Sequence, residues 1–303
     1  MKIGVTGASG LIGTPLVRSL REHGHEVVRF VRGRTDRSEA AADERVWDPA
    51  GHRLDPADLA DLDAVVHLAG AGVADKRWTD ARKAVVLGSR VDGTTTVARA
   101  VAEARAAGQG PSVLLSSSGV NYYGDTGDRL VDETGPTGTG FLPEVCRQWE
   151  ASTEAAAAAG ARVALMRTGP VLTASGGILG RQLLIFKAGL GAPLGSGRQW
   201  LSWISLQDTV SAMRHLLTAD VEGPVNLVSP APVTNREFTK AMGRAVRRPT
   251  LPIAVPGAAL RLAIGPAVDE IILIGQRLAP AVLQRSGFAF AHNDVDAALR
   301  ASL

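Results

Sequence analysis

Three glycines near the N-terminus constrain the fold more than any other feature of this sequence. Gly7, Gly10 and Gly13 follow the short apolar run KIGVT and lead into a segment with helical spacing. In such a junction the first glycine turns the chain out of a strand, the second lets the backbone approach a diphosphate, and the third lets the helix pack on the sheet. A turn with a purely structural role is the alternative. We predict a bound dinucleotide here, held by residues that include Gly7, Ser9, Gly10, Leu11, Ile12 and Gly13.

Short apolar runs alternate with helical patterns along the first half of the chain. Gly, Pro or Asp bound these runs, which is typical of buried strands in a parallel sheet: KIGVTG, HEVVRFV, DAVVHLAG, PSVLLSSS and ARVALMR. The first two runs flank an amphipathic helical face made of Ile12, Leu16, Val17 and Leu20. This alternation predicts an α/β fold, a Rossmann-type doubly wound parallel sheet, with a smaller and mostly C-terminal substrate lobe.

The alternation weakens after residue 169, which suggests a boundary. We expect residues 1–169 to form the dinucleotide-binding domain, with a segment at about 200–230 returning to it. Residues 170–303 would supply most of the substrate lobe, including a small helical domain from about residue 251. In this lobe Thr234 and Glu237 have the spacing of a capping box at the start of a helix.

The end of the second strand indicates which dinucleotide is bound. An acidic residue there would accept the ribose hydroxyls of NAD and repel a 2'-phosphate. This chain instead has Arg32, with Arg34 two residues later, which favours NADP, although two solvated arginines remain the alternative. The next strand ends in HLAG, where Leu68, Ala69 and Gly70 are expected against the cofactor and His67 is expected to pack within the strand.

Composition and charge exclude several functional classes. The formal net charge is only +3 and the basic residues are scattered among acids, which argues against nucleic-acid binding despite a pI of 9.3. No window resembles a membrane span or a signal peptide, and the single cysteine, Cys146, allows neither an internal disulfide nor a multi-cysteine metal site. We therefore expect a cytoplasmic protein that binds no metal and acts on a polar or anionic small molecule; a homodimer is left open.

Five segments together resemble the extended short-chain dehydrogenase/reductase superfamily, and more closely its atypical branch of epimerase-family oxidoreductases with unknown substrates. These segments are GASGLIG at 7–13, HLAGAGVADKRW at 67–78, SSSGVNYYG at 116–124, RTGPVL at 167–172 and GSGRQWLSWISLQD at 195–208. The resemblance covers essentially the whole chain, including the small helical domain at its end. It implies an NADP-binding domain in which Ser116 and Ser117 end a strand beside the nicotinamide.

The same resemblance exposes a departure in the segment FLPEVCRQWE, at 141–150. Typical members use a Tyr-x-x-x-Lys pair to move the substrate proton. When the segment is anchored on Glu150, Leu142 falls at the tyrosine position and Cys146 at the lysine position. Arg90 stands where the superfamily often has an asparagine. We predict that the segment is a helix whose Leu142 and Cys146 share one face, take no part in proton transfer, and leave Cys146 as a buried thiol.

Other residues must then provide the chemistry. Ser118 and Tyr123 are the catalytic candidates, although anchoring on Tyr123 shifts the serine position to Gly119. Tyr123 resembles the tyrosine of the superfamily's Tyr-Gly turn, which is usually a packing and cofactor-wall residue. Trp203 and Asp208 are also expected to lock the second lobe onto the first. The residues assigned to the substrate site are Lys76, Arg77, Arg90, Arg198 and Trp203.

Two functions remain open. The first is an NADP(H)-dependent oxidoreductase or epimerase-like enzyme that lacks the usual dyad. The second is a catalytically inactive NADPH-binding sensor or scaffold. The predicted substrate lobe favours the enzyme, and the missing dyad favours the sensor.

Overall fold

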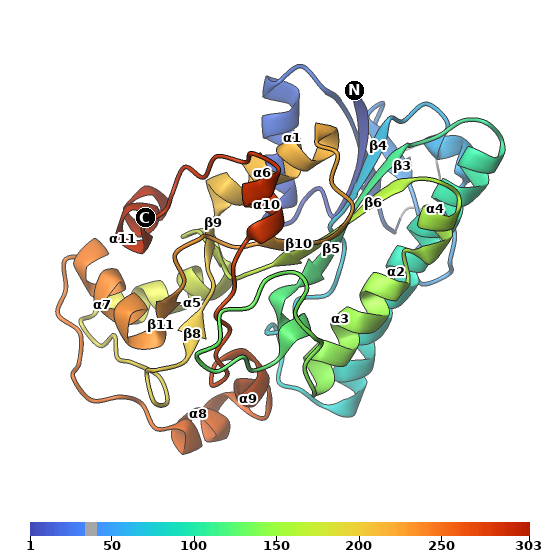
Figure 1. Ribbon diagram of the computed structural model, residues 1–303. Coiled ribbons are helices and arrows are strands. Elements are labelled where there is room, and N and C mark those ends of the chain that lie inside the picture. The colour runs from blue at the N-terminus through green and yellow to red at the C-terminus, as the bar shows by residue number, and fades with distance from the viewer. Residues whose placement is uncertain (34–40) are drawn as a thin grey trace.

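The computed structural model describes residues 1–33 and 41–303. In these residues the main sheet has seven parallel strands, and Figure 1 shows their arrangement. Their spatial order is β10-β6-β5-β4-β1-β2-β3. The strands are β1 (Lys2–Thr6), β2 (Glu26–Val31), β3 (Glu44–Val46), β4 (Ala64–His67), β5 (Val113–Gly119), β6 (Arg162–Thr168) and β10 (Gly223–Leu227). The strand order reverses between β1 and β4, where doubly wound sheets bind dinucleotides. The predicted fold class is confirmed.

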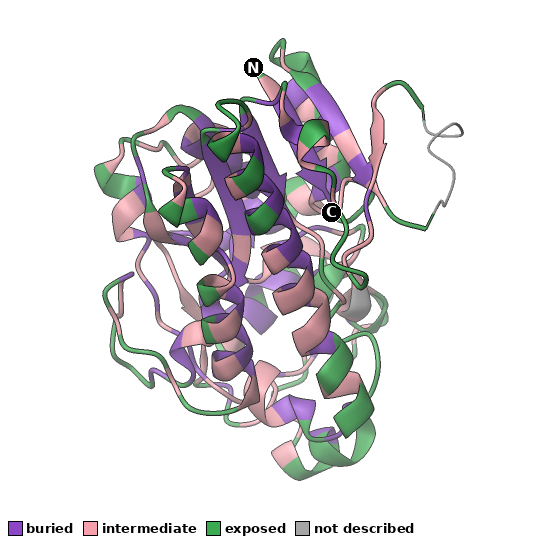
Figure 2. Ribbon diagram, turned by 90° about the vertical axis from the view of Figure 1, so that its right-hand side faces the viewer, coloured by how far each residue is buried: buried purple, intermediate pink, exposed green. Residues whose placement is uncertain are grey.

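Helices cover both faces of this sheet, as the apolar strands require. One face packs against α1 (Gly13–Glu22), α6 (Leu206–Thr218) and α10 (Ala281–Arg285). The other face packs against α2 (Asp80–Ala106), α4 (Glu154–Ala158) and a 3-10 turn at Pro56–Leu59, and α3 (Phe141–Ala151) lies beside α2 and β5. The buried strands therefore form the middle layer of a sandwich (Figure 2).

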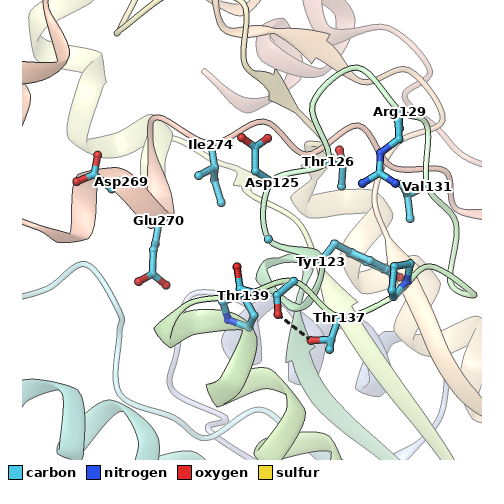
Figure 3. Close-up of a pocket in the computed structure, with 14 residues that line it drawn as sticks. Tyr123, Asp125, Thr126, Arg129, Val131, Thr137, Thr139, Asp269, Glu270 and Ile274 are labelled. Carbon is cyan, nitrogen blue, oxygen red and sulfur yellow. Dashed lines mark hydrogen bonds between the residues drawn. The ribbon is translucent and has the colours of Figure 1, made fainter.

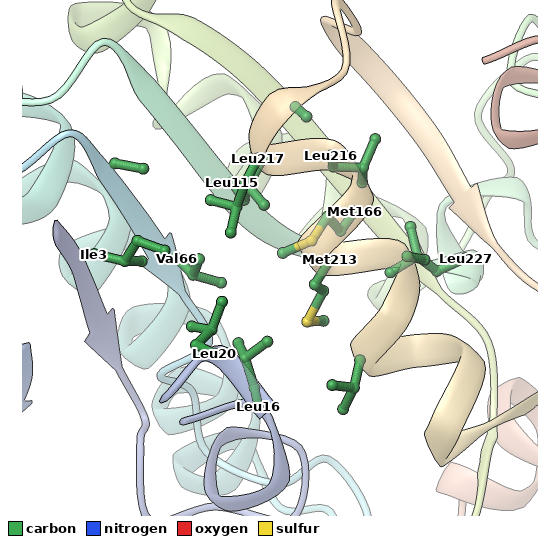
Figure 4. Close-up of a cluster of buried hydrophobic side chains, with 14 of the residues drawn as sticks. Ile3, Leu16, Leu20, Val66, Leu115, Met166, Met213, Leu216, Leu217 and Leu227 are labelled. Carbon is green, nitrogen blue, oxygen red and sulfur yellow. The ribbon is translucent and has the colours of Figure 1, made fainter. Parts of the chain in front are cut away.

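The larger apolar core lies between the sheet and the pair α1 and α6 (Figure 4). The helical face expected from the sequence contributes Leu16, Val17 and Leu20 to it, all of them buried. Strand residues such as Ile3, Val66 and Leu115 meet them from the sheet. This packing fixes the start of α1 against the carboxyl end of β1.

A second lobe gathers beyond the strands of the main sheet, at the left of Figure 1. It contains β7 (Val171–Leu172), α5 (Gly177–Lys187), β8 (Trp200–Leu201), β9 (Ile204–Ser205), β11 (Val233–Thr234), α7 (Asn235–Ala245), α8 (Gly257–Ile264), α9 (Ala267–Ile271) and α11 (Val295–Ser302). Its own core joins α5, α7 and α11. The capping box expected at Thr234 and Glu237 is present at the start of α7. None of the helices in the described ranges has the length and hydropathy that a membrane crossing needs.

Candidate dinucleotide site and the cavity beside it

The glycine loop between β1 and α1 has the geometry of a phosphate cradle. Gly7 adopts a φ of +66°, which favours glycine, and its carbonyl accepts a 3.0 Å hydrogen bond from the N–H of Gly10. A Cβ at Gly13 would overlap that same carbonyl oxygen. Gly10 is exposed. The N-cap residue of α1, Ile12, offers no capping side chain, and the first turn of the helix has no acidic residue. The free N–H groups of the helix start therefore fit a diphosphate.

The other cofactor residues expected from the glycine loop and the second strand lie at the same edge. Ser9 and Leu11 are exposed in the loop. The side chain of Leu11 lies close to Gly176, the residue before α5. Arg32 directly follows β2, is exposed, and forms no ion pair with any other described residue. Arg34, the second arginine assigned to a 2'-phosphate, lies outside the described residues.

The carboxyl end of β4 is tied to the glycine loop through the hydroxyl of Thr6. This oxygen accepts hydrogen bonds from the N–H groups of Leu68 (3.1 Å) and Ala69 (3.2 Å). Its own proton is then directed to Nδ1 of His67, 2.8 Å away. Burial lowers the pKa of His67 to about 4, so the ring is neutral and packs within the strand as expected. This arrangement brings Leu68, Ala69 and Gly70 beside the predicted diphosphate site.

The serines at the end of β5 have three different environments. Ser116 is fully buried opposite His67 in register, and its Oγ forms no hydrogen bond with any described residue. Ser117 is partly exposed at this edge. Ser118 donates a 2.6 Å hydrogen bond to Oε1 of Glu150, on α3. Only Ser118 is therefore tied to an ionisable side chain.

Glu150 belongs to a buried polar network. Arg167, on β6, holds both carboxylate oxygens of Glu150 through Nε and Nη2, at 2.8 Å each. Nη1 of Arg167 donates to the hydroxyl of Tyr123 at 2.9 Å, and that hydroxyl donates to Oδ1 of Asn226 at 2.8 Å. Burial raises the pKa of Tyr123 to about 12. The network joins β5, α3, β6 and β10.

This network requires a correction for Tyr123. Its hydroxyl donates its one proton in a hydrogen bond to Asn226 and accepts a hydrogen bond from Arg167. Only 4% of the residue is exposed. A tyrosine held in this way is not placed to exchange a proton with a substrate. Tyr123 is a packing residue, and Ser118 remains the catalytic candidate.

The segment FLPEVCRQWE forms α3, as predicted. Leu142 packs with Trp78 and Ala267 in an apolar cluster between the loop after β4 and α9. Cys146 is buried, with Sγ 3.6 Å from the carbonyl oxygen of Gly119, and burial raises its pKa to about 12. The carboxylate of Glu270, on α9, accepts the N–H groups of Phe141 and Leu142 and so caps α3. Neither Leu142 nor Cys146 offers an acid or a base to a ligand.

The residues assigned to the substrate site have different environments. Lys76 and Arg77 are exposed in the loop after β4, and Arg77 lies against Gly265, just after α8. Arg198 is exposed in a turn of the second lobe. Arg90 is buried, with 9% of the residue exposed, next to Gly70.

Trp203 is wrongly assigned to the substrate site. The residue is 0% exposed, belongs to the core of the second lobe, and donates from Nε1 to the carbonyl of Ala231. A fully buried side chain cannot contact a ligand in the cleft. Asp208 instead accepts the N–H groups of Ala291 and His292, which fastens the segment before α11 to α6.

A cavity of about 410 Å³ opens between the loop after Tyr123, the start of α3 and α9 (Figure 3). This volume is in the range of small-molecule sites. The carboxylates of Asp125, Asp269 and Glu270 and the guanidinium of Arg129 are the charged groups in its lining. Asp269 also pairs with Arg261, outside the lining. Of the predicted site residues that the structure describes, only Tyr123 lines the cavity. The polar lining is therefore more acidic than the expected cationic cleft.

The fold and the glycine loop define a Rossmann-type dinucleotide-binding protein. Residues 3–228 match the NAD dependent epimerase/dehydratase family, and residues 255–302 match a domain of unknown function, DUF1731. The chain therefore belongs to the NAD dependent epimerase/dehydratase family and is an NAD(P)-binding protein of short-chain dehydrogenase/reductase type.

Several relatives match along nearly the whole chain. Epimerase family protein MT2273 of Mycobacterium tuberculosis is 48% identical over 98% of this chain and 96% of its own. The crystal structure of human epimerase family protein SDR39U1 (isoform 2) with NADPH has a TM-score of 0.88 and 31% identity, over 100% of this chain and 99% of that one. A nucleoside-diphosphate sugar epimerase from Corynebacterium glutamicum has a TM-score of 0.80 and 34% identity, over 100% of this chain but 58% of that one.

Proposed function

We propose that this protein is an NADP(H)-dependent oxidoreductase or epimerase-like enzyme that acts on a polar small molecule. The observation that carries the proposal is the exposed Arg32, without a partner among the described residues, at the strand end next to an uncapped phosphate cradle. A guanidinium there binds a 2'-phosphate and discriminates against NADH. The NADPH in the human SDR39U1 structure supports the same choice.

Each part of the cofactor would have a place along this edge. The glycine loop from Gly7 to Gly13 would hold the diphosphate, Arg32 the 2'-phosphate, and Leu68 to Gly70 would form a wall. The bound nicotinamide would supply or accept a hydride. The chain's own residues must orient the substrate and handle the proton that accompanies this hydride.

Ser118 and Glu150 are suited to accept the proton that leaves the substrate. Because Ser118 donates to Glu150, its Oγ is left with lone pairs that accept a hydrogen bond from a substrate hydroxyl. A proton received by Ser118 can be matched by the transfer of its own proton to Glu150, a carboxylate fixed by Arg167. A hydroxyl-bearing substrate also suits the acid-lined cavity better than an anion does.

A catalytically inactive sensor of NADPH is the second candidate. The hydroxyl of Tyr123 is fully engaged, and Leu142 fills the position of the usual tyrosine with an apolar side chain. Such a protein would bind the dinucleotide without transferring hydride. Homodimer formation is compatible with either function and remains a proposal.

Hydride transfer from labelled cofactor separates the two functions. The protein is incubated with [4-²H]NADPH and the small-molecule fraction of a cell extract, and mass spectrometry follows deuterium in the products. Protein-dependent incorporation supports the enzyme, whereas tight NADPH binding without incorporation favours the sensor. Gly10→Asp is the control, because its carboxylate would repel the diphosphate. The added Cβ would lie 3.2 Å from the carbonyl oxygen of Gly7, so circular dichroism must show that this variant folds.

A further inference from the structure

Arg90 is a buried cation that has no counter-ion among the residues that the structure describes. It lies on α2, and its Nη1 donates to the carbonyls of Ala71 (2.9 Å) and Val86 (3.0 Å). Within the described ranges Arg90 forms no ion pair, and its Nε and Nη2 bond to no protein acceptor. Neither of these two nitrogens is fully buried, so both can be reached by solvent or a ligand. Burying a charge in this way is costly unless an oxygen-rich ligand compensates for it.

The surroundings of Arg90 place it at the dinucleotide edge. A Cβ on Gly70, three residues after the end of β4, would lie 3.7 Å from Cζ of Arg90. The guanidinium also lies over the ring of Trp149, on α3, with Cζ 4.8 Å from the ring centroid. Arg90 therefore lies between the end of β4 and α3. The strand order reverses between β1 and β4, and Arg90 lies on the β4–β5 side of that point. The adenosine half of a dinucleotide would lie on the other side, near β2.

Helix α3 itself offers no cation in this place. Burial raises the pKa of the Cys146 thiol to about 12, with Arg90 among the groups that act weakly in the other direction. The neutral thiol contacts the carbonyl of Gly119, and Leu142 is packed in the apolar cluster with Trp78. Two cations act on this thiol, Arg90 from α2 and Arg167 from β6, and Arg167 is paired with the carboxylate of Glu150. Of these two, Arg90 is the cation that forms no ion pair with a described residue, so α2 supplies the uncompensated charge near this part of α3.

We propose that Arg90 binds the nicotinamide-side half of NADP(H), with Nε and Nη2 donating to the ribose and phosphate oxygens. The cation that α3 lacks is thus supplied by α2, and Trp149 holds the guanidinium plane in position. This inference rests on the proposed function and extends it, because it assigns a residue to one half of the cofactor. Arg90 is a binding residue here and moves no proton.

Two ligands that differ in the nicotinamide half test the inference. NADPH holds both halves, whereas adenosine 2',5'-bisphosphate holds the adenosine side and the 2'-phosphate only. Isothermal titration of Arg90→Met should give an NADPH affinity about ten- to hundredfold lower than that of the wild-type protein. The affinity for adenosine 2',5'-bisphosphate should change by less than about twofold, and Arg90→Lys should recover part of the NADPH affinity.

Arg82 provides a matched control on the same helix. It also donates to a carbonyl of the loop after β4, that of Gly72, but it lies two turns earlier and 4.0 Å from the carboxylate of Asp75. Arg82→Met should leave both affinities unchanged. If Arg90→Met does not fold by circular dichroism, Arg90→Gln keeps an amide donor without the charge and serves in its place.

Three results would overturn the inference while leaving the proposed function in place. The first is unchanged NADPH affinity in Arg90→Met, which would leave the cation without a cofactor role. The second is that Arg90→Met lowers the affinity for NADPH and for adenosine 2',5'-bisphosphate equally. The third is that Arg82→Met lowers the NADPH affinity as much as Arg90→Met does. Either result would indicate that the contact with the loop after β4 has a structural role. Absence of NADPH binding by the wild-type protein would instead contradict the proposed function itself, and this inference with it.

Discussion

Replacing Tyr123 by phenylalanine separates a structural role from a catalytic one. The change removes the hydroxyl that donates to Asn226 and accepts from Arg167, in a site where only 4% of the tyrosine is exposed. A neutral hydrogen bond contributes about 1 kcal/mol and one to a charged group about 1.5–3 kcal/mol. Since the two bonds share one oxygen, we expect a loss of about 2–3 kcal/mol in the free energy of unfolding.

The neighbouring tyrosine is the matched control for this change. Tyr122 also stacks on Arg167, with the guanidinium Cζ 3.5 Å from its ring centroid, but its hydroxyl bonds to no other described residue. Tyr122→Phe should therefore lower the free energy of unfolding by less than about 0.5 kcal/mol. Urea unfolding followed by tryptophan fluorescence measures both variants, and NADPH titration should give affinities within about twofold of the wild type. Full stability in Tyr123→Phe together with abolished hydride transfer would refute the structural assignment.

Further predictions concern three other buried or capping groups. Cys146→Ala should keep NADPH affinity within about twofold, and the native thiol should resist a disulfide reagent at pH 8 until the protein is unfolded, because its pKa is about 12; a tenfold loss of affinity would show a role for the thiol. The pKa of His67 is about 4 in the folded protein, below its ordinary value of 6.5, because the buried ring must stay neutral. The free energy of unfolding is therefore not reduced by His67 above pH 6.5. About 3 kcal/mol should be lost as pH falls from 6.5 to 4, and urea midpoints of wild type and His67→Gln over this range should diverge accordingly. Glu270→Ala should lower the free energy of unfolding by about 1–2 kcal/mol, since two N–H groups at the start of α3 lose their acceptor; an unchanged urea midpoint would argue against this cap.

The sheet and the glycine loop were predictable from the sequence because their signals are local. Each buried strand is a short apolar run, and Gly7, Gly10 and Gly13 have the spacing that one strand–helix junction demands. The capping box at Thr234 was equally readable, since its two partners are three residues apart. Local patterns of this kind do not depend on where the rest of the chain lies.

The errors at the site come from contacts between distant segments. The sequence around Trp203 does not distinguish a cleft wall from a core residue, and only the packing of α5, α7 and α11 decides it. The partners of Tyr123 are supplied by β6 and β10, the latter 103 residues away. The cap that Glu270 places on α3 spans 129 residues and has no periodic signature. Which polar groups meet across such distances is set by tertiary packing.

Cofactor discrimination by Arg32 tests the proposed function most directly. Isothermal titration should show NADPH binding at least about tenfold more tightly than NADH, because a guanidinium bonded to a 2'-phosphate contributes about 1.5–3 kcal/mol. Arg32→Ala should remove this preference, whereas Arg18→Ala, which changes an exposed arginine near Glu22 on α1, should retain it. Equal affinities for NADPH and NADH in the wild-type protein, or a preference that survives in Arg32→Ala, would contradict the proposal that this arginine selects NADP(H).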